Sequence, residues 1–436
     1  MSSATTPNHF RLRLRNASQV VRVSATREAF KRGADMKDLS ILAKATVVVG
    51  SDGKIAAVDT EAALSKLDWY QTATFDLDVD ATGKAVLPGF VDGHTHPVWA
   101  GDRVHEFELK LAGATYLDIH NAGGGIGFTV NKTRDASQQE LEALLRTRLD
   151  RMLRQGTTLV EAKSGYGLEA ETEIKMLRAL KTAQDTHPVE ISATFLGAHS
   201  VPKGSTPAEA TKDVVDKQIP AVVTARDNGD IYVDNIDVFM EKGIFDGEQT
   251  ERILAKGKAC GMCINFHGDE LNYMGSGELG AKLGARAISH LEEISKEGIA
   301  AMAANNVFGV LLPTTAYILR ITPPPAREMV DSGVLVCLGS DFNPNAHCLS
   351  MPFVMNLAAV NMRLTLSEAL VAATLNSAAS LNKSDMHGSI EVGKWGNLVV
   401  VDNPIWTHVV YEMVDSPIAA VFVKGNAVPM TRIASL

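Results

Sequence analysis

Two histidines separated by one residue, His94 and His96, end an apolar stretch that begins at Val86. In an extended chain alternate side chains share a face, so both imidazoles would point the same way. Two imidazoles on one side of a strand end can hold a single metal ion. The motif taken alone fits two histidines in a polar loop equally well, so other parts of the chain have to separate the two interpretations.

The simplest metal site adds one more histidine and one carboxylate from distant segments. We predict a mononuclear site with ligands His94, His96, His267 and Asp341, a donor set that suits Zn²⁺ or iron. A water in an open position would have its pKa lowered toward neutrality. Glu270, three residues beyond His267, could accept a proton from that water, or it could form a structural ion pair. His290 could steer protons at the site or make only a supporting hydrogen bond.

Three further charged residues can be given chemical roles. Arg103 lies in the loop beyond His96, where its guanidinium could bind a carboxylate or simply be solvated. Glu161 and Lys163 stand two residues apart and could pair with each other. A carbamylated Lys163 bridging two metal ions is the less favoured alternative.

Eight short apolar segments, separated by helical patterns, are expected to position these residues. We predict strands over 86–94, 157–161, 190–196, 235–239, 263–266, 285–289, 307–312 and 334–338. Runs such as 139–154, 171–183 and 248–258 have apolar residues at helical spacing, and 366–379 is predicted to be a helix after the last strand. This count indicates an α/β fold, a closed (β/α)₈ barrel of the TIM type.

The barrel would gather the candidate residues, because catalytic groups of such barrels lie at the carboxyl ends of the strands. Five of the twelve histidines follow predicted strands, and so do Tyr166, Glu241 and Asp341. The competing fold, a doubly wound open sheet, needs a G-x-G-x-x-G loop after its first strand. Gly123–Gly127 lacks that spacing and a preceding strand, so we interpret it as a flexible loop that could close over a substrate.

Both ends of the chain are rich in predicted strands. Phe10–Arg15 alternates with period two, 46–49 and 55–58 flank a Ser-Asp-Gly turn, and 388–402 and 419–424 return to strands and turns. We therefore predict one small composite β-sandwich domain from residues 1–88 and 385–436. The barrel would comprise residues 89–384. The alternative is a separate β decoration at each end.

Composition narrows the classes of partner. The 436-residue chain is 45% hydrophobic and 21% charged with a net charge of −9, as in an ordinary globular enzyme. It has no basic stripe for nucleic acid and no apolar run of the roughly 18–20 residues that span a bilayer. Four cysteines are too few for a disulfide framework, and we favour packing for Cys260 and Cys263. The arginine-rich start weakly resembles a transit peptide, but its period favours a strand. We therefore predict a cytoplasmic protein.

Several motifs resemble those of the amidohydrolase superfamily. They are Gly89–Pro97, Phe266–Glu270, Ser289–Glu292, Gly339–Pro344 and 388–402. A second set of motifs is similar to one branch of it, the hydrolases that open the imidazolone ring in histidine degradation. That set comprises 97–103, 113–116 with 123–126, 161–168, 197–199 and 312–315. The resemblance extends from about residue 17 to about residue 430.

This resemblance implies a reaction and a set of site residues. The substrate would be 4-imidazolone-5-propanoate, and hydrolysis of its ring amide would give N-formimidoyl-L-glutamate. One Zn²⁺ or Fe³⁺ would be bound by the four ligands already predicted, and homodimers are usual in this family. Glu270, His290 and Asp341 would be catalytic. Substrate contacts would come from Arg103, Tyr166, His199, Glu270, Asn343, Asn345 and Ala346.

The chain departs from the family pattern at two of these positions. Bacterial members have Gly and then Ser or Thr where Asn345 and Ala346 stand, so a hydroxyl contact at Ala346 is impossible here. Two other function classes remain open at this point. One is another cyclic-amide hydrolase or a nucleobase aminohydrolase of the same superfamily, and the other is a non-catalytic barrel scaffold.

Overall fold

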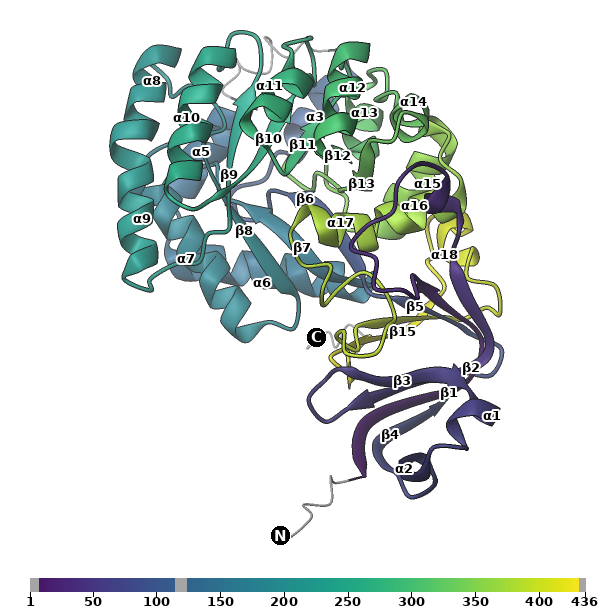
Figure 1. The fold of residues 1–436 in the computed structure, drawn as a ribbon. Coiled ribbons are helices and arrows are strands. Elements are labelled where there is room, and N and C mark those ends of the chain that lie inside the picture. Colours follow the sequence, from purple (N-terminus) through teal and green to yellow (C-terminus); the bar gives the residue numbers. More distant parts are fainter. Residues whose placement is uncertain (1–7, 114–123, 431–436) are drawn as a thin grey trace.

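The structure, a computed structural model, describes residues 8–113 and 124–430 of the chain. One of its two sheets is a parallel barrel in the spatial order β13-β12-β11-β10-β9-β8-β7-β6, with helices around its outside (Figure 1). The eight strands predicted from the sequence are present, with small shifts in their limits. Their bounds are β6 Phe90–Thr95, β7 Thr157–Lys163, β8 Glu190–Ala198, β9 Asn235–Met240, β10 Cys263–Gly268, β11 Ala287–His290, β12 Phe308–Leu311 and β13 Leu335–Leu338.

The helices that follow these strands pack their apolar stripes against the barrel. Leu141, Leu145, Leu149 and Met152 of one long helix are all fully buried, as its helical spacing predicts. The bounds are α3 Val104–Leu111, α5 Ile126–Asp135, α6 Gln138–Arg154, α7 Ala170–Thr186, α8 Pro207–Asp213, a π-helical turn Val214–Gln218, α9 Ile219–Asp227, α10 Gly247–Ala259, α11 Ser276–Leu283, α12 Lys296–Asn305, α13 Pro313–Leu319, α14 Ala326–Asp331, α15 Met351–Met362, α16 Leu366–Ala372 and α17 Leu375–Ser380.

Two predicted elements are each divided in the structure. The strand expected at 86–94 is two strands in different sheets, β5 Ala85–Pro88 and β6, because the Pro88-Gly89 step redirects the chain. The helix expected at 366–379 is broken between α16 and α17. There Thr374 leaves the helical region (φ −134°, ψ −92°), and its hydroxyl donates to Leu370 O. A threonine hydroxyl that bonds to the preceding turn competes with the helix in this way.

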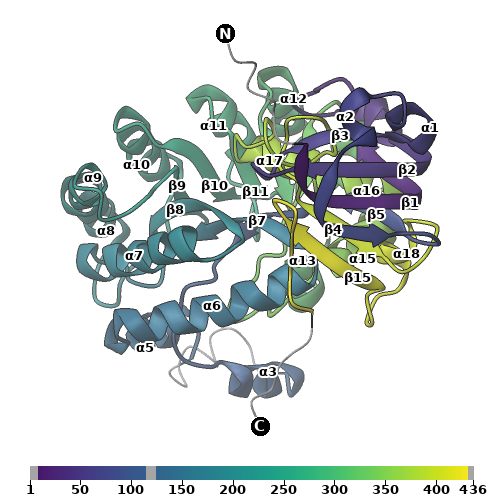
Figure 2. The same cartoon turned by 90° about the horizontal axis from the view of Figure 1, so that it is seen from below.

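The second sheet joins the two ends of the chain. Its order is β16-β15-β14-β5-β1-β2-β3, with β4 paired to β1. Figures 1 and 2 show the purple N-terminal strands and the yellow C-terminal strands in one body beside the barrel. The bounds are β1 His9–Val23, a 3-10 turn Gly33–Lys37, β2 Ser40–Gly50, β3 Ile55–Thr60, α1 Glu61–Leu64, α2 Asp68–Gln71, β4 Thr74–Asp80, β14 Leu398–Val401, α18 His408–Tyr411, β15 Ile418–Val423 and β16 Asn426–Ala427.

This sheet folds over a core of its own. Leu12 and Leu14 of β1 are buried with Val400 of β14 and Phe422 of β15, which confirms a composite domain made by both termini. The arginines that alternate with the two leucines are partly exposed, and Arg13 pairs with Asp78 of β4. The arginine-rich start is therefore a half-exposed strand. We propose that this domain and the barrel divide at Pro88-Gly89 and near residue 385, because β5 and β6 belong to different sheets.

The barrel closes between β6 and the segment that follows β13. Thr95 and Phe342 form the bridge, in which the amide of His96 donates to Phe342 O (2.8 Å) and that of Asp341 donates to His94 O (3.0 Å). A Cβ on Gly93 would lie 2.9 Å from Leu338 O, so the seam depends on a residue without a side chain there. In the part of the chain that the structure describes, no helix is both long and apolar enough to cross a membrane.

Gly93→Ala is expected to destabilise the fold, because the added methyl group meets a backbone oxygen that belongs to a packed strand. The free energy of unfolding should fall by about 1–3 kcal/mol, measured by chemical denaturation. Gly127→Ala is the control, since nothing lies within 4 Å of a Cβ added there. Equal stability of the two variants would contradict a tight seam.

Candidate metal centre

Four side chains from three parts of the barrel converge at its carboxyl end. The Nε2 atoms of His94 and His96 are 3.2 Å apart, and those of His96 and His267 are 3.3 Å apart. Oδ1 of Asp341 lies 3.4 Å from the first of these nitrogens and 3.5 Å from the second. Tetrahedral zinc with bonds of about 2.0–2.1 Å places its ligand atoms roughly 3.3 Å apart. His94, His96 and Asp341 therefore have the spacing of a metal-binding set, and His267 lies at a similar distance from His96.

Neighbouring groups orient these ligands. Oδ1 of Asp237 accepts from Nδ1 of His267 (3.0 Å), which leaves the Nε2 of this ring with its lone pair toward the other ligands. Nδ1 of His94 lies 2.8 Å from the hydroxyl of Ser289. The hydroxyl of Thr315 donates to Oδ2 of Asp341 and leaves Oδ1 to face the histidines.

A buried ammonium group supports the aspartate behind His267. Nζ of Lys163 lies 2.7 Å from Oδ2 of Asp237 and 2.6 Å from Oε1 of Glu161, and all three side chains are at most 1% exposed. This confirms the predicted pairing of Glu161 with Lys163. Burial would raise the pKa of Asp237, but His267 and Lys163 hold it at about 2, so this carboxylate is charged. Lys163 is therefore a cation paired with two carboxylates. This pairing does not fit a carbamylated lysine that bridges two metal ions.

Another buried carboxylate fixes the segment that carries Asp341. Asp92 accepts from the backbone amide of Ser340 (2.8 Å) and from its hydroxyl (2.5 Å). Burial raises the pKa of Asp92 to about 7. A Cβ on Gly339 would lie 2.8 Å from the backbone N of His94, so the two ligand-bearing segments are in close contact.

Glu270 and His290 lie beside the four convergent residues. Oε2 of Glu270 is 3.6 Å from Nε2 of His290, and Nδ1 of His290 is 3.7 Å from Oε2 of Glu292. Burial raises the pKa of Glu270 to about 7, although His290 opposes the rise. Burial lowers the pKa of His290, but Glu270 and Glu292 outweigh it and raise the value to about 10. A buried carboxyl group that titrates near neutrality can both accept and return a proton.

Tyr166 and His199 cover another side of the site. The ring of His199 stacks on that of His96 at 4.7 Å, and the ring of Tyr166 is 5.2 Å from that of His199. Nδ1 of His199 donates to Gly165 O (2.9 Å), so its Nε2 is an acceptor. Burial lowers the pKa of His199 to about 3. The structure thus brings two aromatic rings next to the predicted ligands.

Arg103 has an acidic partner that the sequence did not suggest. Its Nε and Nη2 donate to Oε2 of Glu106 (2.9 and 2.7 Å), and Oε1 of Glu106 accepts from the amide of Gly125. Glu106 is therefore tied both to the predicted carboxylate receptor and to the N-cap of α5. Of the predicted Gly123–Gly127 loop, residue 123 lies outside the described residues, and helix α5 begins at Ile126.

The remaining predicted residues lie in turns beside the site. Oδ1 of Asn343 accepts from the amides of Asn345 (2.7 Å) and Ala346 (3.0 Å), so its side chain organises the turn after Asp341. Ala346 is buried. Glu241 accepts from the amide of Leu271 and from the side chain of Asn272, and so holds the loop that follows Glu270.

Sequence analysis missed the residues that hold the ligands in place. Asp237 and Asp92 are each a single acidic residue inside an otherwise apolar predicted strand, which is a signal that could have been used. Ser289 and Glu106 carried no such signal, because a serine near a strand end and a glutamate on an outer helix are common. Their contacts depend on the closed barrel.

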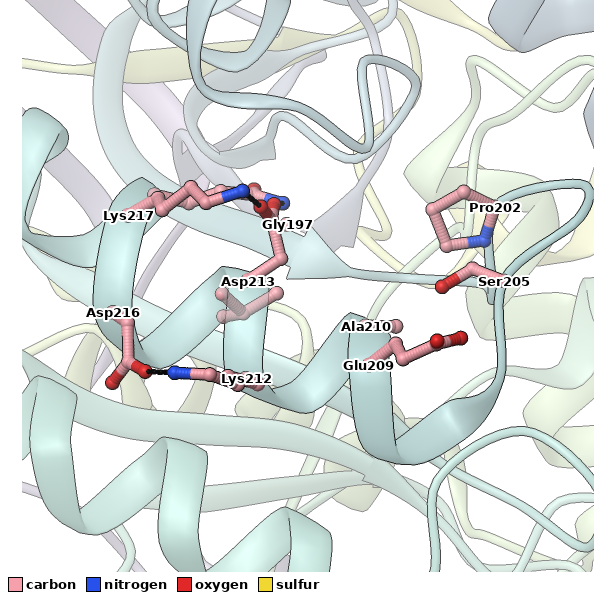
Figure 3. Close-up of a pocket in the computed structure, with 11 residues that line it drawn as sticks. Gly197, Pro202, Ser205, Glu209, Ala210, Lys212, Asp213, Asp216 and Lys217 are labelled. Carbon is pink, nitrogen blue, oxygen red and sulfur yellow. Dashed lines mark hydrogen bonds and ion pairs between the residues drawn. The ribbon is translucent and has the colours of Figure 1, made fainter.

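A separate hollow lies beside α8 and the π-helical turn (Figure 3). Four of its charged lining residues form ion pairs, Lys212 with Asp216 and Lys217 with Asp213, and Glu209 accepts from Thr206. Gly197 of β8 contributes to the lining, whereas the four convergent residues lie elsewhere in the described structure. The barrel's histidine cluster is the better candidate for catalysis.

Comparison with known proteins defines the family. The model of the amidohydrolase family matches residues 85–428. The chain is 57% identical over 402 residues to a Mus musculus protein named "Probable imidazolonepropionase", covering 92% of this chain and 94% of that one. It is 55% identical over 423 residues to a Danio rerio protein of the same name, covering 97% of each. The chain therefore belongs to the amidohydrolase family and, within it, to the imidazolonepropionases.

Solved structures agree with the fold. A triazine hydrolase variant superposes with a TM-score of 0.73 at 16% identity, covering 95% of this chain and 94% of that one. An atrazine chlorohydrolase from Arthrobacter aurescens, solved with zinc, superposes with a TM-score of 0.71 at 16% identity, covering 95% of this chain and 94% of that one. These likenesses confirm the predicted barrel fold.

Asp237→Asn is expected to weaken metal binding by about 10–100-fold, because an amide cannot both satisfy Lys163 and accept from His267. Competition with a chromophoric chelator measures the affinity. Asp185→Asn is the matched control, since Asp185 pairs with Lys181 on the surface of α7. Unchanged affinity in the Asp237 variant would contradict its role in orienting the ligand.

Proposed function

We propose that this protein hydrolyses the ring amide of 4-imidazolone-5-propanoate to N-formimidoyl-L-glutamate, the reaction of the imidazolonepropionases. The observation that supports this most directly is the convergence of His94, His96 and Asp341 at metal-ligand spacing, with His267 3.3 Å from His96, beside an acid–base candidate and a cation. We propose these four residues as the ligands of one Zn²⁺ or Fe³⁺. When bound, the ion would supply Lewis-acid chemistry, lowering the pKa of water and polarising a carbonyl oxygen.

The substrate carboxylate identifies a role for Arg103. The Nε and Nη2 groups of this guanidinium are held by Glu106, which fixes the side chain in one orientation. Nη1 then remains to bind the propanoate group by a charge-assisted hydrogen bond. Tyr166 and His199 would contact the ring, because their own rings lie next to that of His96. Asn343, Asn345 and Ala346 would contribute contacts from the turn after Asp341, those of the last two through their backbone.

Glu270 would move the proton. Its carboxylate would accept a proton from the attacking water and return it to the ring nitrogen that leaves, so that the C–N bond breaks without releasing an anion. His290 lies 3.6 Å from this carboxylate and can donate to the oxyanion that forms on the ring carbonyl. Asp341 would add to catalysis by keeping Oδ1 toward the histidines.

We also propose where and in what form the enzyme works. All four cysteines are free in the structure, which supports a reducing compartment such as the cytoplasm. A homodimer is the assembly that the family resemblance implies. A small-molecule substrate is the partner that a buried site of this kind accepts.

Removal of the metal is expected to abolish ring opening. The purified protein is assayed with 4-imidazolone-5-propanoate before and after dialysis against a chelator, and then after addition of Zn²⁺ or iron. The ion that restores activity at one equivalent per chain decides between the two metals. Full activity after complete metal removal, verified by elemental analysis, would contradict the mechanism.

Arg103→Ala is expected to lower kcat/KM for the propanoate substrate by roughly 100-fold, since a desolvated charge-assisted contact is worth about 3 kcal/mol. An imidazolone without the carboxylate should be hydrolysed at similar rates by the variant and the wild type. Arg178→Ala, which removes a surface arginine paired with Asp230, is the control. Little loss in the Arg103 variant would instead favour a nucleobase aminohydrolase or another hydrolase of uncharged rings, and an equal loss with both substrates would contradict carboxylate binding by Arg103.

A further inference from the structure

A fully buried carboxylate on α7, that of Glu173, holds the loop that follows β7. Its Oε1 accepts from the amides of Gly167 (2.7 Å) and Leu168 (2.9 Å), and its Oε2 accepts from the amide of Gly165 (2.9 Å). The side chain is 0% exposed. Three backbone donors and the first turn of a helix stabilise an anion at such a position.

The loop closes tightly around this carboxylate. Gly165 has φ +109° and Leu168 has φ +55°, both in the left-handed region. A Cβ on Gly167 would lie 2.7 Å from the backbone N of Glu173, so the loop backbone touches the helix directly. This conformation is unfavourable on its own and persists because the surrounding structure determines it. The carboxylate satisfies the three amide groups that the conformation turns inward.

The same loop carries two features of the substrate site. Tyr166 lies between the two anchored glycines, and its ring is 6.0 Å from that of His96. The carbonyl of Gly165 accepts from Nδ1 of His199. One carboxylate therefore sets the position of the tyrosine ring and, through a single residue, Gly165, the orientation of the histidine that stacks on a predicted ligand.

We infer that Glu173 is a positioning residue of the substrate site, which anchors the Gly165–Leu168 loop so that Tyr166 and His199 meet the ring of the substrate. This inference rests on the proposed function for the identity of the substrate. Glu173 touches neither the four convergent residues nor Glu270, so its effect is on binding of the substrate and not on the metal.

The chemistry of the anchor defines a selective variant. In Glu173→Gln the single amide oxygen can still accept from Gly167 and Leu168, but the amino group then faces the amide of Gly165, donor against donor. The hydrogen bond that is lost is therefore the one from Gly165, the residue whose carbonyl orients His199. Glu171→Gln is the matched control, because it removes the same charge from an exposed side chain in the same first turn of α7.

Steady-state kinetics test the inference with both variants. We expect Glu173→Gln to raise KM at least about tenfold and to change kcat less than about threefold, with one metal ion per chain retained. In the double variant with Tyr166→Phe, the increase in KM should be smaller than the product of the two single increases, because both substitutions act on the same contact. A KM within twofold of the wild type, or multiplicative effects in the double variant, would overturn the inference.

Hydrogen exchange separates this inference from the proposed function, since it requires no substrate. We expect amides in 164–168 to exchange faster in Glu173→Gln than in wild type or Glu171→Gln, while those of β6 remain protected. Unchanged exchange in 164–168 would overturn the inference even if the ring is hydrolysed. If the wild type fails to hydrolyse the imidazolone, the proposed function fails, and faster exchange would still establish the anchor. A variant that unfolds globally would lose protection in β6 as well, which would overturn a local role.

Discussion

The hydrogen-bonded seam between β6 and the segment after β13 is the contact on which the site depends. His94 and His96 stand on one side of it and Asp341 on the other, and their backbone groups make the closing bonds. A barrel that failed to close would therefore separate the ligands as well as open an edge. Fold and site share the same few peptide groups, which explains why the glycines at this seam have no room for a side chain.

Three buried carboxylates near the site are held by close partners, which are a cation or hydrogen-bond donors. Asp237 has Lys163, Asp92 has Ser340, and Glu173 has three backbone amides. An unpaired charge in such a place would be expensive, so these pairs keep the ligands in one arrangement. Glu270 differs in its partner, because Nε2 of His290 lies 3.6 Å from its carboxylate, beyond hydrogen-bond distance. That difference suits a group that exchanges protons.

The sequence predicted the barrel strands well because short β-branched runs between amphipathic helices leave little choice of architecture. It also predicted which histidines converge, since the carboxyl ends of parallel strands share one face of a barrel. It could not predict that Glu106 accepts hydrogen bonds from Nε and Nη2 of Arg103, or that Thr374 interrupts a helix. Both depend on contacts between segments that only the folded chain brings together. The division of the stretch at Pro88-Gly89 into strands of two sheets is of the same kind, because pairing partners are not encoded locally.

X-ray absorption at the metal edge of the purified protein tests the central claim most directly. We expect one ion per chain, bound by three imidazole nitrogens and a carboxylate oxygen at about 2.0–2.2 Å, and loss of one nitrogen from that shell in His267→Ala. A protein that binds no ion would contradict a mononuclear site built across the barrel seam. So would a second metal ion about 3.5–4 Å from the first.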